Sequence, residues 1–269
     1  MPVKAPAPVA APVYNWGGFY IGINGGYGWG DTSPSIAALD PDSATFLSGP
    51  PTWFSPGQFA SSFNERGGSV GGQAGYNWQF SRNWVGGLET DIQYAHVQSD
   101  SSNVLFLNPS LFGTNFPFTV NNERTLEWFG TVRGRLGYLV TPDLLIYGTG
   151  GLAYGKTTAS ASILNSPAPG GSNSVNLGSF SCAATGPGAA ACYAGSGSRT
   201  SVGWAAGAGV EAHLIGNFTA KLEYLYVDLG GQTITLISPP PSAPGVATTY
   251  SFGREAINIV RFGLNYKFN

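Results

Sequence analysis

The sequence predicts an all-β protein: an eight-stranded antiparallel up-and-down β-barrel that crosses a membrane. Three observations carry this prediction. Apolar and aromatic side chains occupy every second position over long stretches, charges lie in the middle of those stretches, and short connections alternate with long ones. Charged residues make up only 10% of the 269 residues, against roughly 25% in ordinary globular domains. A surface so poor in charge suits lipid better than water.

The alternation is clearest in the stretch that ends at Phe80. Val70, Ala74, Tyr76, Trp78 and Phe80 share one face of an extended chain, and glycines and amide side chains share the other, because successive side chains of a strand point to opposite sides. In similar stretches elsewhere the second face carries charges. The apolar face is therefore expected to point outward into lipid, and the polar face inward.

Strands are expected over residues 17–31, 67–80, 84–98, 124–140, 144–158, 199–214, 218–230 and 254–268. Tight connections are expected at Ser81-Arg82-Asn83, Thr141-Pro142-Asp143 and Ile215-Gly216-Asn217. The other connections, 32–66, 99–123, 159–198 and 231–253, are long and rich in Ser, Pro, Gly and Asn. Such sorting of loops is typical of outer-membrane barrels, which keep short turns in the periplasm and long loops outside. The chain contains no run of about 18 apolar residues, so a membrane-spanning helix is not predicted.

Aromatic residues are expected to form two girdles where the strands cross the membrane interfaces. The girdle at the short-turn end would hold Trp78, Phe80, Trp84, Tyr138, Phe218, Tyr266 and Phe268. The girdle toward the loops would hold Tyr27, Trp29, Tyr94, Trp128, Tyr154 and Tyr226.

The N-terminal residues 1–16 are rich in proline and alanine and are expected to form an extended periplasmic tether before the barrel, residues 17–269. The segment lacks the basic start, apolar run and cleavage site of a secretory signal. We therefore expect that a signal peptide has been removed.

Three segments, Tyr14–Gly22, Tyr147–Gly155 and Val260–Phe268, give the chain a resemblance to a known family. They resemble the small outer-membrane surface antigens of alphaproteobacteria, often called porin-family proteins, which are similar to the wider OmpA-type eight-stranded barrels. The resemblance implies residence in the outer membrane of a Gram-negative bacterium. Such proteins usually end on an aromatic residue that the barrel-assembly machinery reads, whereas here Asn269 follows Phe268.

Charged side chains on the inward face form the strongest candidate site. In a narrow lumen such charges are desolvated and persist only when they are paired and hydrogen-bonded. The favoured interpretation is a salt-bridge network that plugs the barrel; the alternative is a charged, gated conduit for ions. The set comprises Glu89, Asp91, Glu127, Arg133, Arg135, Glu211, Lys221, Glu223 and Arg261, with His213 and Lys267 nearer the short turns.

Other chemistry has little support. Cys182 and Cys192, both in the third long connection, are expected to form a disulfide in an oxidising envelope compartment. No metal site or cofactor is expected. His96, Ser99 and Asp100 have the residue types of an acyl-transfer triad, but such triads depend on geometry and not on sequence proximity, so no enzymatic activity is expected. The near balance of 12 basic and 14 acidic residues argues against nucleic acid.

The leading functional hypothesis is therefore a structural protein that supports envelope integrity and presents its loops to the outside. The alternatives are a narrow porin-like channel and, through the long loops, capture of haem or of a host surface, which related proteins are thought to perform. Expected partners are outer-membrane lipid, lipopolysaccharide and the barrel-assembly machinery, and in addition peptidoglycan or neighbouring barrels. The long loops are expected to expose apolar residues: Trp53, Phe54, Phe59, Phe63, Leu105, Phe106, Leu107, Leu111, Phe112, Phe116 and Phe118.

Overall fold

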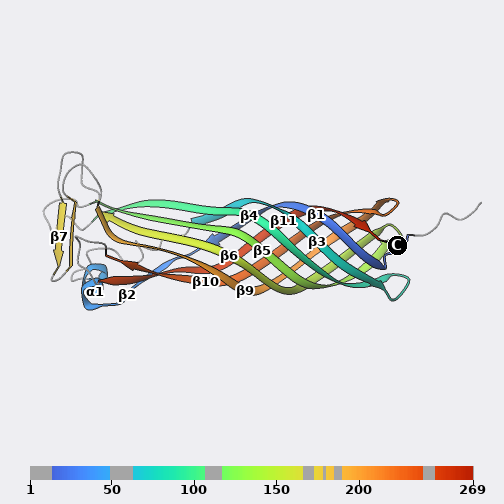
Figure 1. Ribbon diagram of the computed structural model, residues 1–269, viewed down its shortest axis with the longest axis horizontal. Helices are drawn as coiled ribbons and strands as arrows, with labels where there is room; N and C mark the ends of the chain where they lie inside the picture. The colour runs from blue at the N-terminus through green and yellow to red at the C-terminus, as the bar shows by residue number, and fades with distance from the viewer. Residues whose placement is uncertain are drawn as a thin grey trace, which may run out of the picture.

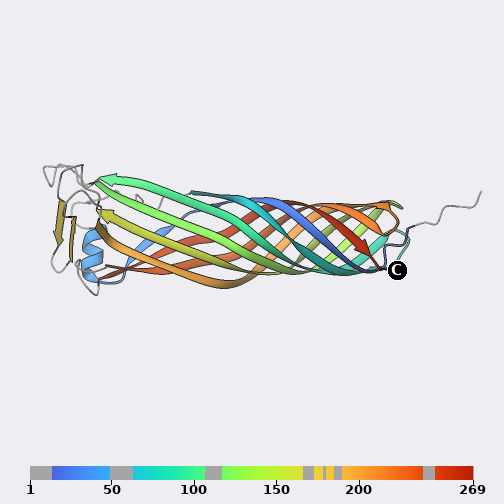
Figure 2. The same cartoon turned by 45° about the horizontal axis from the view of Figure 1, so that its top comes forward.

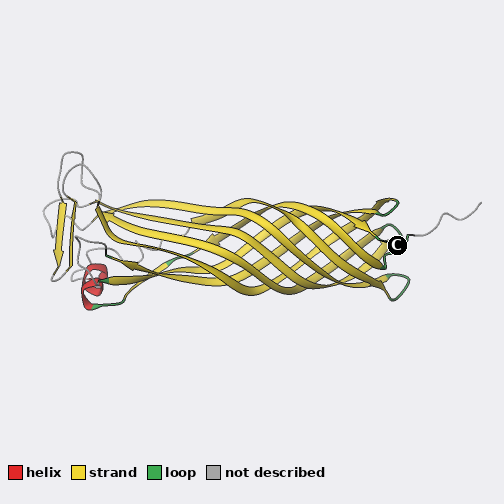
Figure 3. Cartoon of the chain, viewed as in Figure 1, coloured by secondary structure: helices red, strands yellow, loops and turns green. Residues whose placement is uncertain are grey.

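Long antiparallel strands wind around a common axis in the computed structural model, which describes residues 14–48, 63–106, 117–165, 173–177, 180–184, 190–238 and 246–268. The tight turns gather at one end, called here the short-turn end (Figure 1). A helix and the shortest strands lie at the opposite end, called here the long-loop end, and the turned view shows the same arrangement (Figure 2). Strand dominates the described chain between the two ends (Figure 3).

The long strands pair in the order β1-β3-β4-β5-β6-β9-β10-β11. β11 also pairs with β1, from Tyr20 opposite Lys267 to Gly30 opposite Ile257, so the sheet closes on itself. The expected antiparallel up-and-down barrel is confirmed. The strands are β1 (Gly18–Thr32), β3 (Phe63–Gln79), β4 (Trp84–Phe106), β5 (Pro117–Thr141), β6 (Leu144–Asn165), β9 (Ala190–Ile215), β10 (Phe218–Ile237) and β11 (Ala247–Lys267).

The three tight connections lie where they were expected, between β3 and β4, β5 and β6, and β9 and β10. Gly216 adopts a φ of +59° in the last of them, a left-handed conformation in which glycine carries no steric penalty. Inward glycines serve a different purpose: a Cβ at Gly71 would clash with the carbonyl oxygen of Ile92. The bare backbone there lets neighbouring strands curve tightly around a narrow lumen.

The strands extend beyond their expected limits at the long-loop end. β5 begins at Pro117 and not at 124, and β9 begins at Ala190 and not at 199. β9 therefore has 26 residues, whereas crossing a membrane takes only ~9–11. In these extensions hydroxyl side chains such as Ser160 and Thr235 face outward while Val120 and Ile163 are buried. The Ser and Asn residues that suggested loops therefore include the outward-facing residues of strands that continue beyond the membrane into water.

Four short elements complete the long-loop end: β2 (Ser35–Ala38), which pairs with β11, helix α1 (Pro41–Ser48), and the hairpin of β7 (Asn173–Leu177) and β8 (Phe180–Ala184). The Asp40 carboxylate caps α1, since it accepts hydrogen bonds from the backbone N–H of Ser43 and of Ala247, both at 2.8 Å. Burial raises the pKa of Asp40, but these hydrogen bonds outweigh it and hold the pKa below its usual value. α1 is thereby fastened to the start of β11.

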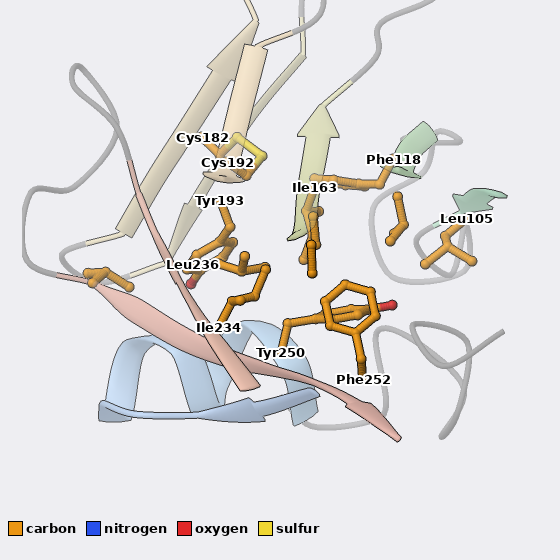
Figure 4. Close-up of a cluster of buried hydrophobic side chains, with 14 residues drawn as sticks. Leu105, Phe118, Ile163, Cys182, Cys192, Tyr193, Ile234, Leu236, Tyr250 and Phe252 are labelled. Atoms are coloured by element: carbon orange, nitrogen blue, oxygen red, sulfur yellow. A yellow bond between two sulfur atoms is a disulfide. The ribbon is translucent and has the colours of Figure 1, made fainter. Parts of the chain in front are cut away.

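The parts of the strands beyond the expected limits, together with β2, α1, β7 and β8, are called here the extension. An apolar core fills it (Figure 4). Ile36 and Leu47, from β2 and α1, pack against it. Leu105 and Phe118, expected on exposed loops, are buried here, because their strands continue past the membrane and turn these side chains inward. Trp53, Phe54, Phe59, Leu107, Leu111, Phe112 and Phe116 lie outside the described residues, and the side chains of Phe63 and Phe106 are not described. The core comprises Leu105, Phe118, Val120, Ala159, Ala161, Ile163, Cys182, Cys192, Tyr193, Ile234, Leu236, Val246, Tyr250 and Phe252.

The outer face of the barrel carries the expected apolar belt. Ile23, Val70 and Leu152 expose more than half of their surface. Aromatic neighbours bound the belt: Trp84 and Tyr138 have ring centroids 5.3 Å apart near the short turns, and Trp204 and Tyr226 have theirs 5.2 Å apart toward the loops. Such girdles mark membrane interfaces.

No helix in the described part of the chain is long and apolar enough to cross a membrane.

The expected disulfide is confirmed. Cys182 on β8 and Cys192 on β9 are joined, with their Cα atoms 5.3 Å apart, and both are fully buried in the core of the extension. The bond ties the β7–β8 hairpin to the barrel (Figure 4).

Replacing both cysteines by alanine should loosen this hairpin and leave the membrane-spanning barrel intact. A disulfide that closes a sequence separation of 10 residues contributes about 2–3 kcal/mol by restricting the unfolded chain. Limited proteolysis with mass mapping should show faster cleavage near the hairpin, with heat-modifiable gel mobility unchanged. Ser198→Ala, an exposed change on β9, is the matched control. Equal cleavage rates in the double variant and the control would contradict the assigned role.

Candidate functional site: the charged interior

The interior charges come from five strands whose alternation turns them toward the axis. Glu89 and Asp91 lie on β4, and Arg133 and Arg135 lie on β5. Glu211 comes from β9, Lys221 and Glu223 from β10, and Arg261 from β11. All of them expose 5% of their surface or less. The barrel thus concentrates charges from opposite walls in one desolvated space.

Some contacts join neighbouring strands in register. Glu89 lies opposite Arg133, and their side chains meet at 2.6 Å. Glu223 lies opposite Arg261, whose Nε donates to it at 2.6 Å. These pairs follow directly from strand pairing.

Other contacts cross the lumen. Lys221 on β10 donates from Nζ to both carboxylate oxygens of Glu89 on β4, each at 2.8 Å. Arg133 reaches Glu223 at 3.2 Å, and Arg261 reaches Asp91 at 2.9 Å. Strands that are not neighbours in the sheet are therefore linked through the middle of the barrel.

Arg135 and two tyrosines complete the network on the short-turn side. Arg135 pairs with Glu211 at 2.6 Å and lies over the ring of Tyr147 at 4.1 Å. Tyr20 donates its hydroxyl proton to Glu89 at 2.7 Å, and Tyr147 donates to Glu223 at 3.0 Å. The tyrosines supply hydrogen bonds that carboxylates with several lone pairs require in a dry site.

The network is electrically balanced. Its cations are Arg133, Arg135, Lys221 and Arg261, and its carboxylates are Glu89, Asp91, Glu211 and Glu223. Four positive groups therefore face four negative groups. A balanced and mutually bonded set favours a fixed structural arrangement over a lumen with a net charge of one sign.

Apolar layers cover the network on both sides. Toward the short turns, Trp16, Val85, Leu139, Leu145 and Tyr147 form a buried cluster. The Trp16 indole N–H donates to the carbonyl of Pro142 at 2.9 Å, so the end of the expected tether is part of the barrel packing. Toward the loops a larger cluster follows: Ala95, Val97, Leu126, Phe129, Ala153, Ala205, Leu225, Val227, Leu229, Ile257 and Ile259.

Glu127 does not belong to the network, and its expected inward position was wrong. The register shifts between Leu126 and Trp128 where β5 pairs with β6. A bulge of this kind inserts one residue and changes which face the following side chains occupy. Glu127 is consequently 36% exposed and pairs with Lys156 at 2.8 Å on the outer surface.

His213 and Lys267 lie at the short-turn end, as expected, and hold the N-terminal segment. The His213 ring stacks on Tyr14 with centroids 4.0 Å apart, and the Lys267 ammonium lies 4.6 Å from the centre of the same ring. His213 also contacts the Asp143 carboxylate at 3.0 Å. Burial, and secondarily the charge of Glu211, raises the pKa of Tyr14 to about 12.

A second buried polar group lies nearer the loops and was missed from the sequence. Arg124 approaches Glu65 at 3.7 Å, and the Thr32 hydroxyl donates to Glu65 at 2.8 Å. All three residues fall in segments that were expected to be connections or the end of a strand. No alternation of apolar and polar residues was recognised there, so their inward orientation could not be predicted. Tyr20 of the main network could have been found from the sequence, because it lies two residues before Gly22 on the inward face of the same strand.

The acyl-transfer alternative has no supporting geometry. His96 is exposed on the outer face of β4, whereas Ser99 is buried on the inner face. Within the described ranges, no group of three or more His, Cys, Asp or Glu residues could hold a metal ion.

Comparison with known proteins adds independent observations. The family model described as the outer membrane protein beta-barrel domain matches residues 4–268. The 31 kDa outer-membrane immunogenic protein of Brucella melitensis is 37% identical over 267 residues, which covers 97% of this chain and 88% of that protein. The 22 kDa outer membrane protein of Rhizobium leguminosarum is 29% identical over 264 residues, covering 97% and 82%. Among solved structures, OprG of Pseudomonas aeruginosa matches with a TM-score of 0.45 at 13% identity, covering 94% and 97%.

Arg133→Ala should destabilise the barrel strongly. It removes one of the two buried arginines that contact Glu89, Asp91 and Glu223, the other being Arg261, and breaking a buried ion pair costs about 3–5 kcal/mol. Urea unfolding in detergent, followed by tryptophan fluorescence, should show a lower midpoint. The control Arg82→Ala, in the exposed turn before β4, should change stability by no more than about 0.5 kcal/mol. An Arg133 variant as stable as this control would refute the network's role.

Proposed function

Since this chain belongs to the outer membrane protein beta-barrel domain family, we propose that it is a closed, eight-stranded structural barrel with its lumen plugged by side chains. The protein resides in the outer membrane of a Gram-negative bacterium, as its relatives do. The observation that carries the proposal is the balanced ion network. Its members bond across the lumen, and apolar layers cover it toward both ends. A barrel of about eight strands has an interior that side chains can fill.

A plugged lumen places the biological role on the outer surfaces. The belt contacts membrane lipid, and the extension with α1 and the β7–β8 hairpin is the part that reaches the outside. The short turns and the N-terminal segment that precedes β1 then lie in the periplasm, and peptidoglycan is a candidate partner on that side. The name of the Brucella melitensis relative calls that protein immunogenic, which agrees with surface exposure of an extension of this kind. β11, which ends beside Phe268, is the segment that the barrel-assembly machinery would read.

Electrical recording tests the plug directly. The folded protein in a planar bilayer should show no stable conductance steps, because a continuous water path would have to cross both apolar layers and the ion network. Folding is verified by heat-modifiable mobility, and an open porin in the same bilayer is the positive control. Reproducible single-channel openings would instead establish a narrow channel, with the interior arginines and carboxylates as its selectivity residues.

Labelling of intact cells tests the orientation. The chain holds 2 cysteines, and both are in the disulfide, so an introduced thiol is unique. Thr235→Cys, on the outer face of the β10 extension, should react with a membrane-impermeant maleimide on whole cells. Ser81→Cys, in the turn before β4, should react only after the outer membrane is permeabilised. The reverse pattern would invert the proposed orientation.

A further inference from the structure

The chain segment just before β1 folds back into the short-turn end of the barrel. Residues Tyr14–Gly17 are called here the strap. Gly18 joins the strap to β1 with a φ of +129°, a conformation that costs glycine less than any other residue. Asn15 Oδ1 accepts a hydrogen bond from the Gly17 backbone N–H at 2.9 Å and stabilises the bend. Trp16, in the middle of the strap, is only 1% exposed, so the strap is packed into the barrel and does not extend away from it.

Several strands hold the strap in place. The Trp16 backbone N–H donates to the side-chain oxygen of Gln79, at the end of β3, at 3.1 Å. Its indole N–H donates to the carbonyl of Pro142, in the turn between β5 and β6. Tyr14 stacks on the ring of His213, near the end of β9, with ring centroids 4.0 Å apart. The strap therefore spans the end of the barrel from β3 to β9.

Lys267 fastens the strap to the last strand of the barrel. Its ammonium, at the end of β11, donates to the carbonyls of Asn15 and Gly17 and lies 4.6 Å from the centre of the Tyr14 ring. The described partners of this ammonium therefore all belong to the strap. Lys267 is only 6% exposed, and a charged group that loses its partners must be solvated. Release of the strap thus requires that water reach this end of the lumen.

Trp16 completes the apolar layer at the short-turn end. It packs in one buried cluster with Val85, Leu139, Leu145 and Tyr147. These four side chains point inward from β4, β5 and β6, whereas Trp16 precedes the first strand of the barrel. Trp16 is also the largest member of the cluster. The strap, and not the barrel wall, thus supplies the bulkiest part of this layer.

The ion network lies directly behind this layer. Tyr147 belongs to both, because it packs in the cluster, donates to Glu223 at 3.0 Å and has the Arg135 guanidinium 4.1 Å from the centre of its ring. Arg135 in turn pairs with Glu211 at 2.6 Å. Ion pairs are stronger where water is excluded. The strap therefore contributes to the layer that keeps water away from the Arg135–Glu211 pair.

We infer that the strap is a removable seal on the periplasmic side of the plug: when docked it keeps the Arg135–Glu211 pair dry, and when released it admits water to that pair while the barrel stays closed. The inference rests on the plugged lumen and the orientation proposed above, and it adds a means of regulation. Release breaks no strand pair, because β1 pairs with β3 only from Gly18 and with β11 only from Tyr20. A periplasmic partner that binds the released strap would shift the equilibrium toward the hydrated lumen.

Thiol accessibility tests the seal on the full-length folded protein in detergent micelles. Val85→Cys places a thiol in the sealed layer, and Val227→Cys places one in the cluster beyond the network; both valines are 1% exposed. The 2 native cysteines form the disulfide, so the introduced thiol is the only free one. When Tyr14→Ala/Trp16→Ala is added, a small charged methanethiosulfonate should modify position 85 at least about tenfold faster, since thiol reactivity depends on exposure. Modification at position 227 should stay slow.

A conservative variant separates sealing from general damage. Trp16→Phe keeps an apolar ring in the layer and should leave position 85 nearly as slow as with the intact strap, whereas Trp16→Ser should behave like the double alanine variant. Equal rates at position 85 with the intact and the altered strap would overturn the seal, and so would a matching rise at position 227. Rapid modification at both positions with the intact strap would instead contradict the plugged lumen itself, and the seal with it. Heat-modifiable mobility verifies that each variant is folded.

Discussion

The desolvation of charge inside a narrow barrel is the constraint on which the rest of this structure depends. A carboxylate or guanidinium removed from water is tolerated only when its partners are close and its hydrogen bonds are satisfied. Here Glu89 illustrates the solution, because it receives bonds from Lys221, Arg133 and Tyr20, which lie on three different strands. The bond from Lys221 joins β4 to β10, which are not neighbours in the sheet. The network therefore links distant strands through the interior, and in the proposed function it also blocks the lumen.

The interior is layered, and the layers follow from this constraint. Ion pairs are strongest where water is excluded, and the clusters around Trp16 on one side and Phe129 on the other exclude it. Beyond the second cluster comes the polar group of Glu65 and Arg124, and then the core of the extension. If the lumen is plugged as proposed, these alternating polar and apolar layers act as several barriers in series.

The same strands serve in two solvents. In the membrane they carry apolar side chains outside and charges inside, and in the extension they carry hydroxyl groups outside and apolar side chains inside. Because the side-chain period of a strand stays at two, the inversion needs only a change in which positions are apolar, helped by the bulge at Glu127. The boundary between the two patterns coincides with the aromatic girdle toward the loops, where lipid headgroups meet water.

The barrel, its girdles and most of its inward charges could be predicted from the sequence, because lipid on one side of a strand imposes an alternation of apolar and polar side chains. Cys182 and Cys192 could be paired because they are the chain's 2 cysteines. The partners of each charge could not be predicted, since bonds such as Lys221 to Glu89 cross the lumen between strands far apart in the sequence. The outward position of Glu127 could not be predicted either, because the bulge that causes it depends on how β5 pairs with β6. The burial of Leu105 and Phe118 could not be predicted because it depends on the extension of their strands along neighbouring strands. Local pattern determined which face each strand shows to lipid, and only the closed sheet decided which side chains meet inside it.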